Sequence, residues 1–227
     1  TFLDPQGYSP LYYGVMVPTI NFQIDVSARG AGSGRNTALL RALGAADWRA
    51  RPLVLLAKLW ARAHSLLDSR RGGLSSYALT LAALGFLQAL RPPVLPAVPN
   101  QTFRSRNRRS LGELFSLFLR YYAEFPYAKL AVSVRCGRPL VRVGGENDPI
   151  WIEEPFDLSN TARTVYSASE LSRLAVALRD SHARLAASLC LKDAWPPDKE
   201  NLNQKIQKVE TNIDYSIRVV ATPSAGT

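Results

Sequence analysis

The chain has 227 residues, 47% of them hydrophobic and 20% charged, which is enough for one large or two small domains with a real core. Lys and Arg outnumber Asp and Glu by 28 to 18, for a formal net charge of +10. This charge suits a phosphate backbone, an anionic membrane or a ribonucleoprotein, but it singles out no reaction. No apolar run reaches the ~18 residues of a membrane-spanning helix, so we expect no membrane protein.

Cysteine and histidine are scarce. The two cysteines, Cys136 and Cys190, have no metal-type spacing, and the two histidines, His64 and His182, are too few for a metal cluster. We expect buried or half-buried free thiols in a reducing intracellular compartment, either cytoplasmic or mitochondrial. Cys190 is predicted to lie on the apolar face of the last helix.

The N-terminal part alternates between turn residues and a strand-like run at Val15–Val26. Residues 29–35 (Arg-Gly-Ala-Gly-Ser-Gly-Arg) predict a flexible, glycine-rich loop. Its amides could hold a phosphate, but the spacing fits neither G-x-G-x-x-G nor the Walker pattern, which favours a plain connector. From Asn36 onwards the pattern is helical.

The rest of the chain up to Leu191 is mostly helical. The segment Ser75–Leu90 is apolar nearly all round, which predicts burial at the centre of a helical domain. Residues Leu130–Arg135 alternate like a strand, and Ile213–Val220 near the C-terminus is also β-like. The remaining helices are predicted over about Ala50–Leu66, Ser110–Glu124 and Ser169–Leu191.

Two acids flank a Pro-Phe corner in the stretch Trp151–Val165. Because Pro fixes its own φ and restricts the residue before it, Glu154 and Asp157 can be held at a defined relative angle, with Asn160 three residues later. Two carboxylate acceptors and one side-chain amide on a fixed loop could form hydrogen bonds with the edge of a heterocycle. The alternative is a helix N-terminus that Ser159 or Asn160 caps.

This stretch is also the strongest family signature of the chain. The run Ile-Glu-Glu-Pro-Phe-Asp, followed by Asn-Thr-Ala-Arg, resembles the noncanonical poly(A) polymerases and terminal uridylyltransferases, which are DNA polymerase beta-like nucleotidyltransferases. The resemblance covers roughly residues 17–190, and three more motifs match in the family's order. They are Arg51-Pro-Leu-Val…Lys58-Leu-Trp-Ala-Arg62, Gly73-Leu-Ser-Ser-Tyr77, and Leu111-Gly-Glu-Leu…Tyr121-Tyr-Ala123.

The resemblance implies an α+β fold that is mostly α, namely a helical poly(A) polymerase-like domain with a partial nucleotidyltransferase palm. The implied boundaries are 1–35 for the partial palm, 36–194 for the helical nucleotide-binding domain and 195–227 for a C-terminal arm that could contact a protein partner.

Family catalysis implies two Mg²⁺ (or Mn²⁺) ions held by three carboxylates. Asp25, in Ile24-Asp25-Val26, matches the third carboxylate and lies eleven residues before Asn36, as the family places it. The alternative is that Asp25 has no catalytic role and faces water at the end of a strand. The family's D-x-D element has no match in this sequence, which leaves open whether the protein is an enzyme.

The resemblance also implies a nucleotide site. Asn36 and Thr37, beside Arg35, match positions that bind ribose and phosphates, although either would serve as an N-cap. Lys58 and Arg62 are four residues apart on one helix face and could reach one triphosphate, although such pairs are usually solvated. Further candidates are Ser76 for a phosphate, Tyr77 for stacking on the base (or as a core residue), and Glu154, Asp157 and Asn160 for the base edge.

A run of arginines between two predicted helices is the candidate RNA contact. It consists of Arg104, Arg106, Arg108 and Arg109, interleaved with Ser and Asn. Such a run is more often a solvated loop, although the net charge of +10 favours RNA.

Two functions from different classes follow. The first is template-independent addition of nucleotides to an RNA 3′ end, with ATP favoured over UTP. The second is an inactive, polymerase-like RNA-binding subunit of a ribonucleoprotein, which the missing D-x-D element and the unfamiliar tail favour.

Overall fold

The computed structural model describes residues 30–99, 102–145 and 147–196. The chain divides between Gly34 and Arg35 into two units, and only the second is described at length. The strand-like run Val15–Val26, Asp25 and the predicted C-terminal arm from residue 197 onwards lie outside the described residues, so the palm and the arm stay predictions.

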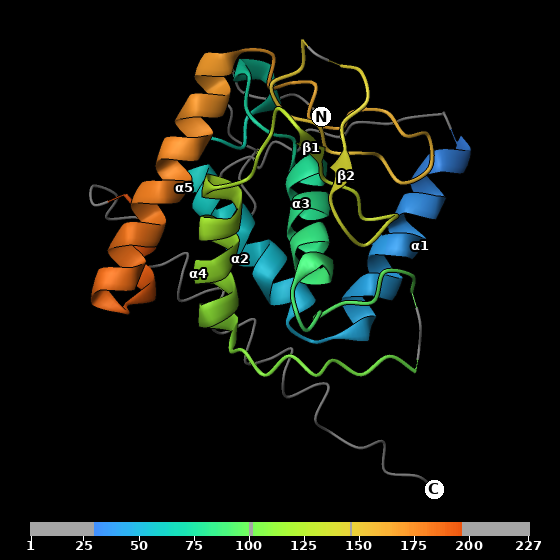
Figure 1. Ribbon diagram of the computed structural model, residues 1–227, viewed down its shortest axis with the longest axis horizontal. Helices are drawn as coiled ribbons and strands as arrows, with labels where there is room; N and C mark the ends of the chain where they lie inside the picture. The colour runs from blue at the N-terminus through green and yellow to red at the C-terminus, as the bar shows by residue number, and fades with distance from the viewer. Residues whose placement is uncertain (1–29, 100–101, 146, 197–227) are drawn as a thin grey trace, which may run out of the picture. The chain divides into compact units, whose positions relative to one another are not determined.

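The described unit is mostly helical with a small sheet, which confirms the predicted fold class (Figure 1). Short 3₁₀ turns over Ser69–Arg71 and Leu191–Ala194 link or follow the main helices. The α-helices are α1 (Gly30–Ala46), α2 (Ala50–Ala63), α3 (Ser76–Ala89), α4 (Leu111–Ala123) and α5 (Ala168–Ser188).

Serine caps fix the starts of two helices where the sequence predicts them. Ser75 Oγ accepts a hydrogen bond from the amide of Ala78 at 3.0 Å and caps α3. At α4, Ser110 Oγ accepts from the amide of Glu113, while the Glu113 carboxylate accepts from the amide of Ser110 at 2.7 Å. This reciprocal capping box satisfies two amides that a helix end would otherwise leave unpaired.

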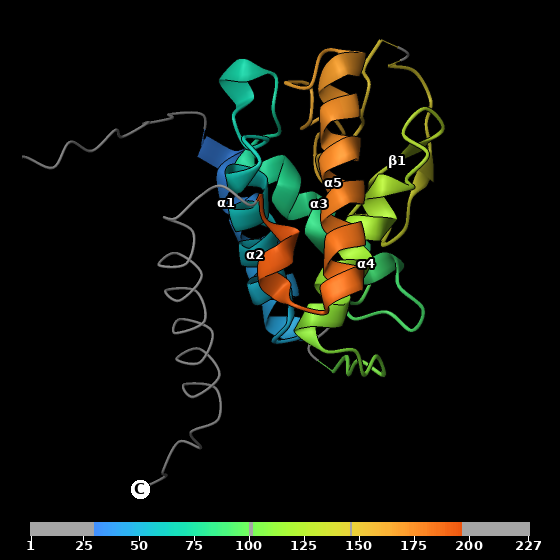
Figure 2. The same cartoon turned by 90° about the vertical axis from the view of Figure 1, so that its left-hand side faces the viewer.

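Helix α3 is the centre of the unit. Its residues 78–88 are all buried, and α2 and α4 pack against it while α5 packs against α4 (Figures 1 and 2). A hydrogen bond from Trp60 Nε1 to Ser181 Oγ at 2.9 Å joins α2 to α5 inside the core. The prediction that the all-apolar segment is the buried central helix is therefore confirmed.

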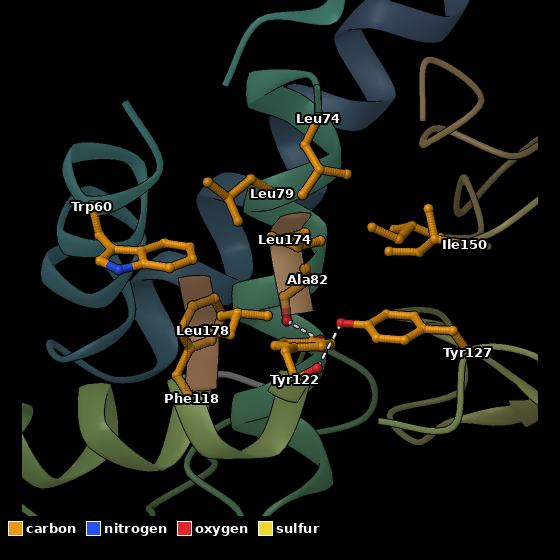
Figure 3. Close-up of a pocket in the computed structure, with 11 residues that line it drawn as sticks. Trp60, Leu74, Leu79, Ala82, Phe118, Tyr122, Tyr127, Ile150, Leu174 and Leu178 are labelled. Atoms are coloured by element: carbon orange, nitrogen blue, oxygen red, sulfur yellow. Dashed lines mark hydrogen bonds between the residues drawn. The ribbon is translucent and has the colours of Figure 1, made fainter. Parts of the chain in front are cut away.

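A small apolar cavity of about 20 Å³, shown in Figure 3, lies in the core between α2, α3, α4 and α5. Two tyrosines beside it keep their hydroxyls satisfied. Tyr122 donates to the carbonyl of Ala82 at 2.7 Å, and Tyr127 donates to the carbonyl of Tyr122 at 2.8 Å. Since the lining is apolar and the volume is that of about one water molecule, the cavity belongs to the packing of the core.

A small sheet lies at the end of the unit where α3 begins (Figure 1). Strand β1 (Leu130–Ala131) pairs antiparallel with β2 (Leu140–Val141). The predicted strand over Leu130–Arg135 is therefore present but shorter, and β2 was not predicted. Beyond β1, Val132 bridges Ile152 in parallel, so that the sheet supports the stretch Trp151–Val165, called the acid loop from here on.

Two predictions from the sequence are wrong. Residues 30–35 are not a loop but the first turns of α1. Each residue added to an existing helix gains a hydrogen bond without a new nucleation step, and this offsets the cost of about 1 kcal/mol for a helical glycine. Cys190 is not on an apolar helix face but exposed, because α5 ends at Ser188, where Leu189 turns into the left-handed region with φ 56°.

The other cysteine agrees with the prediction, since Cys136 is a half-buried free thiol. Near the predicted start of the arm, Trp195 is 2% exposed and stacks on Phe115 at 5.7 Å between ring centroids. The packed core of the helical unit therefore includes Trp195.

Candidate functional site

The acid loop folds back on itself. Glu153 and Asn160 form an antiparallel bridge, and the amide of Glu154 donates to the carbonyl of Ser159 at 2.8 Å. Leu158 closes the turn with φ 64° and donates its amide to the carbonyl of Glu154 at 3.1 Å. The loop is therefore a closed turn rather than the N-terminus of a helix, which removes the capping alternative.

Glu154 connects this turn to α3. Its Oε2 accepts hydrogen bonds from the amides of Phe156 at 2.6 Å and Asp157 at 2.8 Å. Its Oε1 accepts from the hydroxyl of Tyr77 at 3.2 Å, across 77 positions of sequence. Burial, and then the charge of Glu154, raise the pKa of Tyr77 well above its usual range, so the phenol remains a neutral donor. The sequence prediction had placed Tyr77 and Glu154 in one site, and the structure brings them into contact.

Asp157 is the exposed acid of the turn. Its Oδ1 accepts hydrogen bonds from Ser159, from the amide at 2.9 Å and from Oγ at 2.6 Å. These bonds lower the pKa of Asp157, so the carboxylate stays ionised at neutral pH. Beside it, Phe156 is 46% exposed and Leu158 is 49% exposed. Asp157 therefore offers an acceptor next to an apolar surface, a combination that suits an aromatic heterocycle.

Asn160 is placed differently from the other two. Its side chain is 6% exposed, and its Oδ1 accepts from the amides of Ile152 at 3.1 Å and Ala162 at 2.9 Å. Its Nδ2 donates to the carbonyl of Ile150 at 2.9 Å and to Asp148 Oδ2 at 3.1 Å. All four bonds that the amide can make are used inside the loop. The predicted base-reading role of Asn160 thus stays a prediction, while the structure shows it anchoring the loop.

Lys58 and Arg62 lie on α2 as predicted, the first half-buried and the second exposed. Burial, and then the charge of Arg62, lower the pKa of Lys58. Neither side chain forms an ion pair within residues 30–99, 102–145 and 147–196. Two neighbouring cations without a compensating acid in that part of the chain suit a polyanionic ligand such as a triphosphate.

The remaining nucleotide candidates occupy two helices. Ser76 is exposed at the first residue of α3. On α1, Thr37 is exposed, whereas Asn36 is half-buried and its Oδ1 is a buried acceptor without a hydrogen-bond partner among the described residues. A buried acceptor left unpaired is costly, and a ribose hydroxyl would satisfy it.

The described contacts join the candidates in pairs. Tyr77 is bonded to Glu154, and Lys58 is electrostatically coupled to Arg62. No hydrogen bond or ion pair links one pair to the other in the described part of the chain. The structure therefore joins Tyr77 of α3 to the acid loop, and it places Lys58 and Arg62 together on α2.

Two contributions to the site were missed from the sequence. Glu153 is 8% exposed and accepts from Ser133 Oγ at 2.8 Å and Arg135 Nε at 3.0 Å, which fixes the base of the acid loop. Ser159 orients Asp157, and the two-residue Asp-to-Ser spacing typical of an Asx-turn could have indicated it. No local signal pairs Glu153 with Arg135, because eighteen residues separate them.

The predicted carboxylate ligand for a metal, Asp25, lies outside the described residues. Among the residues that are described, no group of three or more His, Cys, Asp or Glu could hold a metal ion. The described side chains thus do not supply a Mg²⁺ site. Nor does any helix within these residues have the length and apolarity needed to span a membrane.

The predicted RNA-binding arginines lie between α3 and α4. Arg104, Arg106 and Arg108 are exposed, whereas Arg109 is half-buried.

The chain is similar to known proteins over part of their length. Residues 110–160, which include α4 and most of the acid loop, match the model of the Cid1 family poly A polymerase. The Poly(A) RNA polymerase GLD2 of Danio rerio is 35% identical over 217 residues, or 81% of this chain and 44% of the relative. The human GLD2 enzyme is 34% identical over 191 residues, covering 70% of this chain and 40% of the relative. The chain therefore spans less than half the length of these relatives.

Solved structures give the same result. A crystal structure of the Cid1 poly(U) polymerase with Mg 3′-dATP bound has a TM-score of 0.63 and 29% identity, over 67% of this chain and 56% of that one. A crystal structure of mtPAP in complex with UTP has a TM-score of 0.65 over 82% of this chain and 44% of that one, but at 23% identity it supports the fold alone. In its sequence motifs, in the family model that residues 110–160 match and in its helical fold, the chain is similar to the poly(A) polymerases and terminal uridylyltransferases.

Proposed function

We propose that this chain is the nucleotide-binding helical part of a template-independent RNA 3′-end nucleotidyltransferase that uses ATP in preference to UTP. The observation that carries the proposal is the hydrogen bond between Tyr77 and Glu154, which unites an aromatic ring with the acid loop at the start of α3. Its relatives in Danio rerio and Homo sapiens are named poly(A) RNA polymerases.

Each side chain has a role that its surroundings support. The ring of Tyr77, held by Glu154, stacks on the base, while the ionised Asp157 accepts a hydrogen bond from its edge. Since adenine carries an exocyclic amino group, an ionised acceptor suits ATP. The uracil N3–H could donate to the same carboxylate, which keeps UTP as the second substrate to test.

The phosphates and ribose require other groups. Lys58 and Arg62 supply two cations for the triphosphate, and Ser76 adds a hydroxyl at the positive end of α3. Asn36 Oδ1 supplies a buried acceptor for a ribose hydroxyl. Together these groups bind and orient the nucleotide, so that in this proposal the described residues contribute positioning rather than bond cleavage.

Mg²⁺ supplies charge neutralisation on the triphosphate and activation of the RNA 3′-hydroxyl in enzymes of this type. Crystal structures of the Cid1 poly(U) polymerase hold Mg 3′-dATP and, in a mutant, MgATP. Since the described residues of this chain offer no ligand set for the ion, no catalytic step is assigned to them.

A second candidate function is RNA and nucleotide binding without catalysis, as in a polymerase-like subunit of a ribonucleoprotein. The sequence contains no match to the family's D-x-D element, and this lack favours the second candidate function.

The test is extension of a 5′-labelled RNA oligonucleotide by the purified protein with Mg²⁺ and each nucleoside triphosphate in turn. We expect added adenylates with ATP, fewer additions with UTP, and loss of extension in the Tyr77→Ala and Asp25→Ala variants. Nucleotide binding without extension would support the inactive subunit. If neither nucleotide binds, the proposed site is wrong.

A further inference from the structure

Residues 104–109, called the arginine segment from here on, form an extended stretch that is fastened to the helical unit. Ser105 Oγ donates to the carbonyl of Pro93 at 2.8 Å, and Asn107 Nδ2 donates to the carbonyl of Pro92 at 2.7 Å. Ser105 Oγ and Asn107 Oδ1 also accept from the amides two residues later in the chain, at 3.1 and 3.0 Å. Such a network is not that of a freely solvated loop.

A buried arginine at the start of α2 also holds the segment. Arg49 is 6% exposed, and its Nη1 donates to the carbonyls of Asn107 at 2.9 Å and Arg109 at 2.7 Å. The rest of its guanidinium is paired with the carboxylate of Asp47 at 2.8 Å. Arg49 is thus an anchor, because its charge is balanced by Asp47 and each of its three side-chain nitrogens donates a hydrogen bond.

This fastening separates the side chains onto two sides. Ser105 and Asn107 face the unit, and Asn107 is 3% exposed, whereas Arg104, Arg106 and Arg108 are exposed. Exposed residues thus alternate with buried or half-buried ones, which places Arg104, Arg106 and Arg108 in one exposed row. Arg109 does not belong to this row, since it is half-buried.

Two charges of the exposed row, those of Arg106 and Arg108, are not balanced by an ion pair in the described part of the chain. Fixing like charges along one edge costs stability, and a ligand with regularly spaced negative charges would offset that cost. Phosphate groups fit, because the planar guanidinium can donate two parallel hydrogen bonds to each.

The segment lies away from the nucleotide candidates on α3. It is fastened to Pro92 and Pro93, just beyond the end of α3, whereas Tyr77 is at the start of that helix. A helix of 14 residues is about 20 Å long, at about 1.5 Å per residue. In Figures 1 and 2 the segment passes the ends of α3 and α4 that are remote from the β1–β2 sheet.

We propose that Arg104, Arg106 and Arg108 bind the phosphate backbone of single-stranded RNA, independently of base sequence and away from the nucleotide site. The proposal rests on the proposed function in one respect, namely that RNA is the substrate. Its contribution is to retain the RNA body while the 3′ end is at the active centre, so that the row affects RNA affinity and not nucleotide affinity.

The test compares two charge-matched triple variants of the full chain. The first replaces the row, Arg104→Gln/Arg106→Gln/Arg108→Gln. The second removes three other exposed cations, Arg138→Gln/Arg179→Gln/Lys192→Gln. Binding of a fluorescent single-stranded RNA of mixed sequence is measured by anisotropy at several salt concentrations, without nucleotide, and ATP affinity is measured separately for each protein.

For single strands each lost phosphate contact lowers the slope of log affinity against log salt by about 0.7, so the row variant is expected to lose about 2 in slope. The control variant should keep a slope close to that of the unmodified chain, and all three proteins should bind ATP equally. An equal salt dependence of RNA binding in the two variants, or no RNA binding by the unmodified chain, would contradict the proposed role of the arginine row. Neither result would bear on the nucleotide site. Binding of a polyglutamate peptide as tight as that of RNA would overturn it in favour of an acidic protein partner.

Discussion

The acid loop and the arginine segment are held in place in similar ways but expose opposite charges. Each is an irregular stretch fastened by a buried asparagine, Asn160 in the first and Asn107 in the second. The acid loop turns most of its polar groups inward and leaves Asp157 exposed. The arginine segment turns its neutral polar groups inward and leaves three cations exposed. In both, the uncharged asparagine amide anchors the stretch to the helical unit, and the exposed charge is available to a ligand.

This comparison changes how an asparagine in a binding motif is interpreted. From the sequence, Asn160 resembles a base-reading group, yet its amide is engaged within the loop. Asn107 has no counterpart among the predicted ligands, yet it places the charged row. A positioning role of this kind can be tested separately from ligand contact.

The largest expected effect is on stability, from Asn160→Ala. The substitution leaves the amides of Ile152 and Ala162 and the carbonyl of Ile150 without their partner. At about 1–3 kcal/mol for each buried unpaired group, partly relieved by water, we expect a loss of roughly 3 kcal/mol in the free energy of unfolding. Urea denaturation measures it, with Ser172→Ala on the exposed side of α5 as the control. Equal stability of the two variants would show that Asn160 is not the anchor.

Asn107→Ala is expected to cost less, about 2 kcal/mol, because it frees one carbonyl and one amide. It should also weaken RNA binding although no charge is removed, since the row of arginines loses its fixed spacing. Asn107→Asp keeps the acceptor for the amide of Arg109 and provides the partial control. Unchanged RNA affinity in Asn107→Ala would mean that the row needs no anchor.

At the nucleotide site, Tyr77→Ala should weaken ATP binding by about 1–3 kcal/mol, the range for base stacking on an aromatic ring, or roughly 5- to 150-fold. Tyr77→Phe keeps the ring and loses only the bond to Glu154, so a loss near 1 kcal/mol is expected. Isothermal titration measures both, with the 70% exposed Tyr166 replaced by Ala as the control. A phenylalanine variant as weak as the alanine variant would show that the bond to Glu154, and not stacking, dominates.

The smallest effect concerns pH. The pKa of Lys58 in the free protein lies below its usual 10.5, and a bound triphosphate would raise it. ATP affinity should therefore be highest at pH values below the pKa of Lys58 in the free protein. It should fall as the pH rises through that pKa, by no more than about tenfold per pH unit. Lys58→Arg, which stays protonated, should flatten the profile. A profile that is the same in both proteins would remove Lys58 from the phosphate site.

The helical part of the fold was predictable because its signals are local. Ser75 and Ser110 mark the starts of α3 and α4, and the all-apolar run between residues 78 and 88 marks the centre of the core. Glycines at 30, 32 and 34 were misleading, because they lower helix propensity without preventing extension of a neighbouring helix. The end of α5 depends on the left-handed turn at Leu189, a residue with no turn preference of its own.

Of the candidate site, the proximity of Tyr77 and Glu154 was predictable, whereas the contacts that hold the acid loop were not. The family motifs placed Tyr77 and Glu154 together, and the structure joins them. The direction of the Asn160 amide could not be foreseen, because it depends on the path of the chain at Asp148 and Ile150. The alternation of the arginine segment is visible in the sequence, but its fastening by Arg49 comes from a residue 58 positions away.

The most direct test of the central claim, that nucleotide binds between α3 and the acid loop, is photocrosslinking with 8-azido-ATP followed by peptide mass spectrometry. We predict labelling in the segments 72–91 and 143–163, which contain Tyr77 and Asp157, with competition by ATP stronger than by UTP. The label should be unaffected when Arg104, Arg106 and Arg108 are replaced by Gln. If ATP competes only with labelling of other segments, nucleotide does not bind between α3 and the acid loop.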